Sequence, residues 1–403
     1  MTDALIIGGG IAGVAAALAL RKAGIHAVVH ERRPDDGGDE ADSGAFLTVF
    51  ANGIAALRTI DAHQPVLDAS FGADRVEFIG STGKRLGTRP IAGGQDGSAG
   101  GPRTLRRATL HRVLHQEAER LGVPIRYGSR FAAAHTAPNG RIVASFADGG
   151  RAQADVLIGA DGIHSATRRI IDAAAPRPRY TGQTTVCGYT RDAPDAPAPG
   201  AYTMVYGKRA FFGCTVAPDG EVWWFANVPG PEIPRAELAA IPAGQWRERL
   251  TALFAEDRTP AAGIVRASGD IIVATAGYEI PTTPIWSGDA MVVIGDAAHA
   301  AAPNAAQGAS LAIEDAVVLA TCLRDLPRRR AFAAYERLRR ERVERLVAAS
   351  AAMARNTAPG AVGRLLRDTL LARRLDRGSA GADDWLTGYR IDWAQTVGHH
   401  PAQ

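Results

Sequence analysis

The chain has 403 residues, of which 46% are hydrophobic and 22% are charged, as in a globular protein with two or three domains. Its net charge of +4 is too small to argue for a nucleic-acid partner, and no stretch reaches the roughly 18 uninterrupted apolar residues that a membrane span needs. Cys187, Cys214 and Cys322 show neither paired nor metal-like spacing and the N-terminus shows no signal peptide, so we expect a soluble, cytoplasmic protein without a metal site.

The first motif is a glycine-rich turn near the N-terminus. The apolar run 4–7 predicts a strand and residues 11–23 predict a helix, so the intervening G-x-G-x-x-G pattern lies at a strand-to-helix turn. In that context Gly8 permits the tight turn, Gly10 lets the backbone approach a pyrophosphate, and Gly13 lets the helix pack closely on the strand. Phosphates would meet the free N–H groups at the start of the helix.

A second apolar strand, predicted at residues 27–30, leads to Glu31 and Arg32. Glu31 follows Gly8 by 23 positions, close to the separation of about 20 that is typical of an acid binding ribose hydroxyls. An acid here disfavours a 2′-phosphate, so the turn would take FAD or NAD rather than NADP. We include the adjacent Arg32 among the predicted cofactor-binding residues.

Two segments in the middle of the chain have a different sequence pattern, with short β-like runs in place of long helical ones. Residues 71–97 and 176–284 contain short β-like runs, such as 202–206 and 221–225. Turn signals such as residues 218–220 separate these runs, which is typical of an antiparallel sheet. Six aromatic side chains in these strands are candidates for lining a substrate site, although alternation along a strand sends about half of them to the other face. They are Tyr189, Tyr202, Phe211, Phe212, Trp224 and Phe225.

A second motif follows the apolar strand predicted at residues 155–158. It contains Asp161 and Gly162 and continues through Ser165, an expected helix N-cap, to Arg168.

A third motif, G-D-A-A-H, begins at Gly295 after the apolar strand predicted at 290–294, and a helix starts near Gly308. Gly295 lies 287 positions after Gly8. Two glycine-bearing strand ends that lie far apart in the chain, each suited to binding phosphate, indicate one long dinucleotide bound at both ends. This is the arrangement of an FAD site. Asp296 would accept hydrogen bonds from the ribityl hydroxyls, and the N–H groups near Gly308 would face the pyrimidine edge of the flavin.

From Arg328 onward the pattern is helical. Its mixed charge and modest apolar face favour a helix that packs on protein over one that lies on a membrane. The apolar side chains that fall broadly on one face are Phe332, Tyr335, Leu338, Leu346 and Val347.

The three motifs, in this order over about 300 residues, resemble the FAD-dependent aromatic hydroxylase family, the single-component flavoprotein monooxygenases built like p-hydroxybenzoate hydroxylase. The second motif matches the family's G-A-D-G-x-x-S-x-x-R at every fixed position. The third matches its G-D-A-A-H, with Pro303 and Gly308 in register. Arg107 opens an R-x-x-L similar to the family's stretch whose arginine reaches the flavin. The family usually has Gly where this chain has Ala306 and Pro where it has Ala51.

Together, the pattern of predicted strands and helices and the family resemblance predict an α/β fold. It would consist of a Rossmann-like FAD-binding domain with an inserted antiparallel β-sheet substrate domain and a C-terminal helical tail. The expected boundaries are 1–70, 98–175 and 285–325 for the discontinuous FAD-binding domain, 71–97 and 176–284 for the substrate-binding β-sheet domain, and 326–403 for the C-terminal helices.

The resemblance also implies the chemistry: an FAD-dependent monooxygenase that uses NADPH or NADH and dioxygen. It would hydroxylate an aromatic or polycyclic small molecule by way of a flavin C(4a)-hydroperoxide. Asp161, Gly162 and Arg168 would touch FAD and the nicotinamide donor, which would bind transiently because no second dinucleotide fingerprint is present. The catalytic candidates are Pro303, shaping the oxygen pocket, and His299, whose role in the family's motif is largely structural.

Three alternatives on the same fold stay open at this point. They are a flavin-dependent epoxidase acting on an alkene, an FAD oxidase or dehydrogenase that takes hydride directly from its substrate, and a flavin-bound binding protein without turnover. NAD(P)H consumption that rises with substrate separates a monooxygenase from the last two. The position of the inserted oxygen separates hydroxylation from epoxidation.

Overall fold

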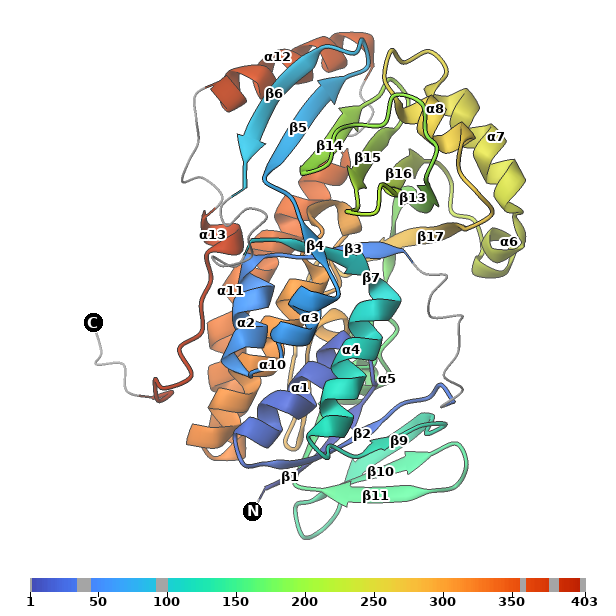
Figure 1. Ribbon diagram of the computed structural model, residues 1–403. Coiled ribbons are helices and arrows are strands. Elements are labelled where there is room, and N and C mark those ends of the chain that lie inside the picture. The colour runs from blue at the N-terminus through green and yellow to red at the C-terminus, as the bar shows by residue number, and fades with distance from the viewer. Residues whose placement is uncertain (1, 35–44, 92–100, 356–359, 377–383, 399–403) are drawn as a thin grey trace.

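The computed structural model describes residues 2–34, 45–91, 101–355, 360–376 and 384–398. Within these residues, a parallel sheet with its helices forms one part of the molecule and a larger, mostly antiparallel sheet forms the other (Figure 1).

The parallel sheet carries all three motifs at one edge. Its strands, in spatial order, are β18 (Met291–Val293), β12 (Val156–Gly159), β1 (Asp3–Ile7), β2 (His26–His30) and β8 (Ile125–Arg126). Every neighbouring pair is parallel. Because parallel strands place their carboxyl ends at the same edge, the turns that follow β1, β12 and β18 meet there.

The two faces of this sheet are covered differently, and alternation along each strand decides which side chains face which cover. Ile6 and Ile158 face the helical layer, whereas Leu5 and Leu157 face a small antiparallel sheet. That small sheet consists of β9 (Phe131–Thr136), β10 (Ile142–Phe146) and β11 (Arg151–Ala154). The sheet is therefore buried on both faces, which explains its nearly continuous apolar strands.

The helical layer is built around α10 (Gly308–Asp325), which packs against α1, α2 and α11. Small alanine side chains fill much of α1, so these helices approach closely. The helices of this layer are α1 (Ile11–Lys22), α2 (Ala51–Thr59), α3 (Gln64–Asp68), α4 (Arg107–Arg120) and α11 (Arg328–Arg355). On α11, Phe332, Tyr335, Leu346 and Val347 are buried as predicted, whereas Leu338 is exposed.

The larger sheet has seven strands and packs one face against helices. In spatial order the strands are β17 (Ile272–Glu279), β13 (Arg179–Thr190), β16 (Val222–Pro229), β15 (Phe211–Val216), β14 (Ala201–Tyr206), β5 (Arg75–Gly80) and β6 (Arg85–Pro90). All neighbours are antiparallel except β14 and β5, which are parallel. The helices on the covered face are α6 (Arg235–Ala240), α7 (Ala243–Phe254) and α8 (Ala261–Arg266).

Short elements join the two parts. A three-stranded antiparallel sheet of β3 (Phe46–Val49), β7 (Arg103–Arg106) and β4 (Phe71–Gly72) lies between them (Figure 1).

The remaining elements are α5 (Ala166–Ile171), α9 (Asp296–His299), the 3-10 helix η2 (Pro303–Ala305), α12 (Ala361–Asp376), which packs on β6, and α13 (Asp384–Thr387).

This architecture confirms the predicted fold class: a parallel α/β part, an inserted sheet and C-terminal helices. That the two parts act as an FAD-binding and a substrate-binding domain with the boundaries given above stays a prediction. Within the described residues, no helix is long and apolar enough to cross a membrane.

Candidate functional site

The three motifs converge because glycines remove side chains at their contacts. Gly8 has φ +104°, and a Cβ there would clash with the carbonyl oxygen of Ala160 in the second motif. Gly295 has φ +58°, and a Cβ there would lie 3.0 Å from the Cβ of Ala12 and 3.3 Å from that of Ala312. Both conformations favour glycine. The first motif therefore touches the second at Gly8 and the third at Gly295.

The start of α1 is open to a ligand. A Cβ on Gly13 would clash with the carbonyl oxygen of Gly8, so the helix begins directly against the turn. Gly10 is the N-cap and makes no side-chain capping bond. Apart from its chain neighbours, no heavy atom of the described residues would lie within 4 Å of a Cβ on Gly10. The free N–H groups and this open space suit an anion such as pyrophosphate.

Glu31 is buried at the end of β2, where its carboxylate holds the glycine turn. It accepts the N–H of Gly9 at 2.6 Å and the N–H of Arg33 at 2.9 Å. Burial raises the pKa of Glu31, but the two N–H bonds and the Arg33 guanidinium outweigh burial, so its pKa lies below the ordinary value. Glu31 is thus an ionised acid beside the turn, and the neighbouring Arg32 is exposed.

Two histidines that sequence reasoning missed fix the other side of the same turn. His111 and His115 lie one turn apart on α4, and their Nε2 atoms lie 2.9 Å and 2.7 Å from the carbonyl oxygen of Gly9. His115 also bonds the Tyr127 hydroxyl at 2.8 Å. Burial is the main cause that lowers both pKa values, to about 4 for His111. Their spacing on a helix was visible in the sequence, but which turn they would meet was not.

Asp161 of the second motif caps α5. Its carboxylate accepts the N–H groups of Ala166 at 2.8 Å and Thr167 at 3.0 Å, and the Ser165 hydroxyl at 2.5 Å. Gly162 beside it has φ +76°. The carboxylate that the resemblance assigns to cofactor contact is therefore engaged in local structure.

Arg168 ties the second motif to the third. It is 1% exposed, and its guanidinium donates to the carbonyl oxygens of Ile163 and Ala297, each at 2.7 Å. Its backbone N–H donates to Ser165 at 2.9 Å, which confirms Ser165 as the N-cap. Because the Arg168 side chain is buried, a direct contact with a nicotinamide donor would require the packing around its guanidinium to open.

The turn after β18 places a carboxylate beside the start of α10. Asp296 is exposed, and its carboxylate has no donor partner in the described part of the chain. A Cβ on Gly308 would lie 4.0 Å from Asp296 Oδ1, so the two are neighbours. Gln307, directly before α10, is 1% exposed; its Oε1 accepts from Asn52 at 3.1 Å, while its Nε2 lacks a partner among the described residues. A buried donor without a partner marks a place for a polar ligand.

Ala306 has φ +51°, the left-handed conformation that favours glycine. The family's usual glycine at this position fits that backbone. Alanine keeps the same turn here at a cost of roughly 1–2 kcal/mol. The side chain of Ala306 is exposed, so the cost comes from the backbone and not from crowding.

His299 is buried and bonded, which favours a structural role. Its Nε2 lies 2.5 Å from Asp315 Oδ2, and its ring centroid lies 5.5 Å from that of Trp286. With Nε2 engaged by Asp315, only Nδ1 could exchange a proton with a substrate, and the side chain is buried. Pro303, the other catalytic candidate, starts η2, and its side chain lies outside what the structure describes. Arg107 starts α4 with an exposed side chain.

Alternation separates the candidate aromatics into two groups. Phe212 and Trp224 are fully buried against α7 and α8. The rings of Phe211 and Phe225 lie 5.9 Å apart on the opposite face and are partly exposed. Phe46 of β3 contacts Phe225, with ring centroids 6.2 Å apart, so this second face looks toward the parallel part.

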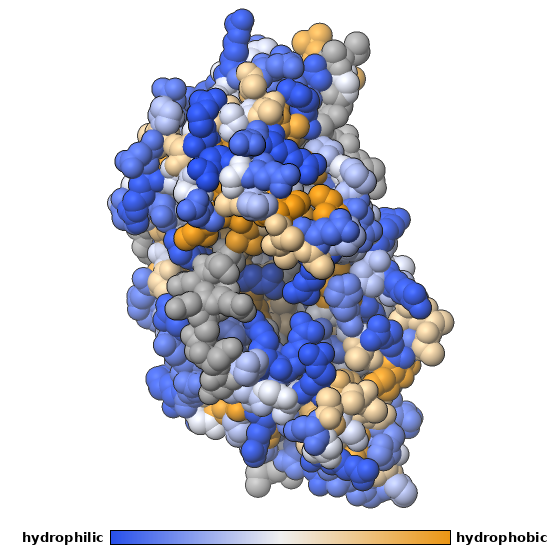
Figure 2. All heavy atoms as spheres, turned by 90° about the vertical axis from the view of Figure 1, so that its right-hand side faces the viewer, coloured by the Kyte–Doolittle hydropathy of each residue, from blue (hydrophilic) through white to orange (hydrophobic). Residues whose placement is uncertain are grey.

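The two remaining aromatic candidates are engaged at the border of the two parts. The Tyr202 hydroxyl bonds Thr104 at 2.5 Å. Tyr189 lies under the guanidinium of Arg106, 4.5 Å from its ring centroid. The space-filling view shows the surface hollowed at mid-height, between an upper and a lower part (Figure 2).

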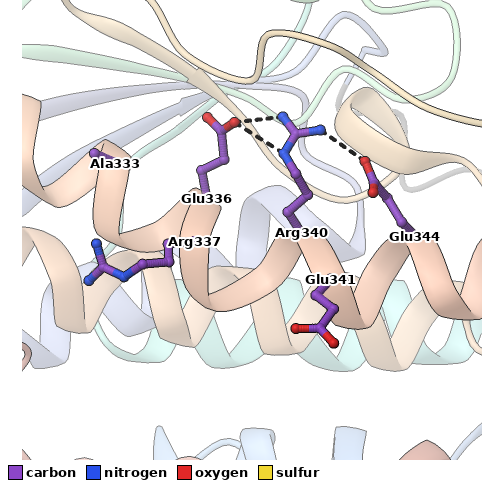
Figure 3. A pocket seen from close by; sticks show the side chains of 6 residues that line it. All are labelled: Ala333, Glu336, Arg337, Arg340, Glu341 and Glu344. Carbon is purple, nitrogen blue, oxygen red and sulfur yellow. Dashed lines mark hydrogen bonds and ion pairs between the residues drawn. The ribbon is translucent and has the colours of Figure 1, made fainter. Parts of the chain in front are cut away.

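A pocket is lined by side chains from one face of α11 (Figure 3). Arg340 at its centre pairs with Glu336 at 2.6 Å and Glu344 at 3.0 Å. None of its lining residues belongs to the three motifs, so we assign neither cofactor nor substrate to it. They are Ala333, Glu336, Arg337, Arg340, Glu341 and Glu344. Across the described ranges, no group of three His, Cys, Asp or Glu side chains has the geometry of a metal site.

Comparison with known proteins points to one family. The family model described as "FAD binding domain" matches residues 1–350. The chain is 32% identical to an aurachin C monooxygenase/isomerase of Stigmatella aurantiaca over 86% of this chain and 87% of that protein. It is 30% identical to an FAD-dependent urate hydroxylase of Mycolicibacterium vanbaalenii over 85% of each. Among solved structures, Klebsiella pneumoniae HpxO complexed with FAD and uric acid superposes with a TM-score of 0.83, at 24% identity over 96% of this chain and 97% of that chain.

Acid should destabilise the protein through His111. Its pKa is about 4 when folded against an ordinary 6.5, so between these values the unfolded chain binds the proton and the folded chain does not. The free energy of unfolding should therefore fall as pH drops from 6.5 to 4, by up to about 3 kcal/mol from this group. His111→Gln should make the fall smaller, as measured by urea unfolding at pH 7 and pH 4.5 with FAD held constant. The exposed His135, replaced by Gln, is the control. An unchanged fall in the His111 variant would contradict this assignment.

The backbone strain at Ala306 predicts how the free energy of unfolding changes when this residue is replaced by glycine or by valine. Ala306→Gly should raise the free energy of unfolding or leave it unchanged, since relief of strain is offset by about 0.4–1 kcal/mol of added unfolded-state entropy. Ala306→Val should lower it by more than about 1 kcal/mol, because a β-branched residue tolerates positive φ poorly. Thermal unfolding measures both, with Ala305→Val as the neighbouring control. A valine variant as stable as the parent would show that the turn is not strained.

Proposed function

The chain belongs to the FAD binding domain family of FAD-dependent, aromatic-hydroxylase-type monooxygenases, and on that premise we propose that it uses NAD(P)H and dioxygen to hydroxylate an aromatic or heterocyclic small molecule. The family confirms the resemblance, the FAD cofactor and the oxidoreductase class expected from the sequence. The electron donor, the site residues and the substrate are the proposed part.

The observation that carries the assignment is the convergence of the three motifs around two helix starts without side-chain caps. The pyrophosphate would bind at the open N-terminus of α1, next to Gly10, and Glu31 would bind the adenosine ribose. Asp296 would bind the ribityl hydroxyls. The N-terminus of α10, where the Gln307 side-chain amide lacks a partner, would face the pyrimidine edge. These residues therefore offer partners for the pyrophosphate, the adenosine ribose, the ribityl chain and the pyrimidine edge of FAD.

Bound FAD, once reduced, supplies the chemistry that activates dioxygen. The chain's own residues hold and enclose it. The positive end of the α10 dipole favours negative charge at the pyrimidine edge. Asn304 of η2 donates to Gln183 of β13 at 3.3 Å, which joins the turn before α10 to the larger sheet. This contact would help to exclude water from the space between the two parts.

The substrate would lie on the face of the larger sheet opposite α6, α7 and α8, beside the portion of that face that α12 covers at Tyr206. Phe211 and Phe225 present partly exposed rings there, which suit a planar substrate. Thr185 donates to Asn227 at 2.9 Å on the same face, so polar groups for hydrogen bonding lie among the rings. The urate named for one relative is a substrate of this general kind.

The test is NAD(P)H oxidation by the purified, flavin-loaded protein in the presence of a panel of aromatic and heterocyclic compounds under ¹⁸O₂. We expect one compound to accelerate NAD(P)H consumption and to gain one labelled oxygen atom. Substrate oxidation without NAD(P)H, with release of peroxide, would instead establish an oxidase. Oxygen added across an alkene would establish an epoxidase.

Adjacent residues on β15 provide a matched test of the substrate face. Phe211→Ala should raise KM roughly three- to tenfold, because one aromatic contact contributes about 0.5–1.5 kcal/mol, and it should change stability little. Phe212→Ala should lower the free energy of unfolding by about 3–5 kcal/mol, because its ring is fully buried against Trp224 and Phe254. Steady-state kinetics and thermal unfolding distinguish the two effects. The reverse pattern would place the substrate elsewhere.

A further inference from the structure

Asp315 connects the two segments that would face the flavin. It lies on α10 with no exposed surface. Its Oδ2 accepts the backbone N–H of Gly295 at 2.9 Å and lies 2.5 Å from His299 Nε2. A single carboxylate on α10 therefore holds both ends of the turn that carries Asp296.

A buried set of charges holds Asp315 in turn. Arg339 of α11, also without exposed surface, donates from Nε to Asp315 Oδ1 at 2.7 Å and pairs with Glu314 at 2.5 Å. Arg342 pairs with Glu314 at 2.8 Å. Two carboxylates thus face two guanidinium groups. Burial raises the pKa of Asp315, but His299, Arg339 and the Gly295 N–H outweigh it and keep the pKa well below its ordinary value.

The companion carboxylate Glu314 reaches the other side of the helix start. Its Oε1 accepts from Asn52 of α2 at 2.6 Å, and the same Asn52 amide donates to Gln307 at 3.1 Å. The neighbouring side chains Glu314 and Asp315 therefore connect α10 to two different segments, and only Asp315 reaches the Gly295 turn.

We propose that Asp315 is a positioning residue for the flavin, one that fixes the Gly295–His299 turn and hence the Asp296 carboxylate against the start of α10. Gly295 lacks a Cβ and has many conformations open to it, so its φ of +58° depends on such external contacts. The proposal rests on the proposed function, because it requires FAD to bind at Asp296 and α10.

A merely structural role and a positioning role predict different rankings of two variants by their Tm and by their affinity for FAD. Asp315→Asn keeps an oxygen that can accept the Gly295 N–H but leaves Arg339 without one counter-charge, which is strongly destabilising in a buried site. The double variant Asp315→Leu with Arg339→Met keeps the charges balanced but offers no acceptor to Gly295 or His299. Apolar replacement of a buried ion pair is often neutral for stability.

The experiment measures FAD dissociation constants by flavin fluorescence on protein freed of its cofactor, together with Tm and the visible circular dichroism of the bound flavin. For a positioning role, we expect the double variant to bind FAD at least tenfold more weakly with altered dichroism at near-parental Tm. Asp315→Asn should have the lower Tm yet bind within about threefold of the parent. Affinity that simply follows Tm across the variants would overturn the proposal.

Two further variants complete the design. Leu323→Ala, in the buried core two turns along α10, controls for loss of helix stability and should lower Tm without changing affinity for FAD. If the double variant does not fold, His299→Leu removes one of the two bonds alone and should weaken FAD binding by a smaller factor; unchanged affinity and dichroism would then count against positioning. Failure of the parent itself to bind FAD would contradict the proposed function instead.

Discussion

The arrangement of the molecule follows from one steric constraint: three turns must meet with less room between them than a methyl group occupies. A side chain on Gly8 would clash with the second motif, and a side chain on Gly295 would press on both α1 and α10. The parallel sheet creates the meeting by ending β1, β12 and β18 at one edge. Glycine then permits the contact distance, and each of these two positions also uses a positive φ. The proposed cofactor site is a consequence of this packing rather than of any single motif.

Such close packing leaves backbone polar groups of the turns to be hydrogen-bonded by side chains from other elements. The peptide of Gly9 is held on both sides, by the Glu31 carboxylate and by two histidines of α4. The Gly295 turn is held by Asp315, whose counter-charge Arg339 comes from α11. Buried ion pairs contribute little net stability, and one well-attested use of them is to select a single arrangement. On this interpretation, the long helix α11 belongs to the cofactor site although it carries no recognisable motif.

In the larger sheet, side chains alternate between the two faces along each strand, so neighbouring residues have different surroundings. Phe211 and Phe212 are neighbours in sequence, yet one ring lies on the face toward the parallel part and the other is sealed under α7. The covered face stabilises the sheet through its apolar core. The opposite face keeps aromatic and polar side chains partly exposed where the two parts meet. On the proposed function, the covered face stabilises the sheet and the opposite face contacts the substrate.

The local features of the fold can be predicted from the order of the amino acids alone. Apolar runs marked β1, β12 and β18, glycine spacing marked the turns, and Ser165 marked a helix cap, because strands, turns and caps depend on residues close together in the chain. Their order also identified the family and its cofactor. Which side chains act together emerges only from the packing of the folded chain. Asp161 engages α5, Arg168 joins two motifs, and the buried residues His115 and Asp315 support turns 106 and 20 positions away. Such contacts depend on how helices pack against the sheet, and neither spacing nor residue type encodes that packing in a form that can be read locally.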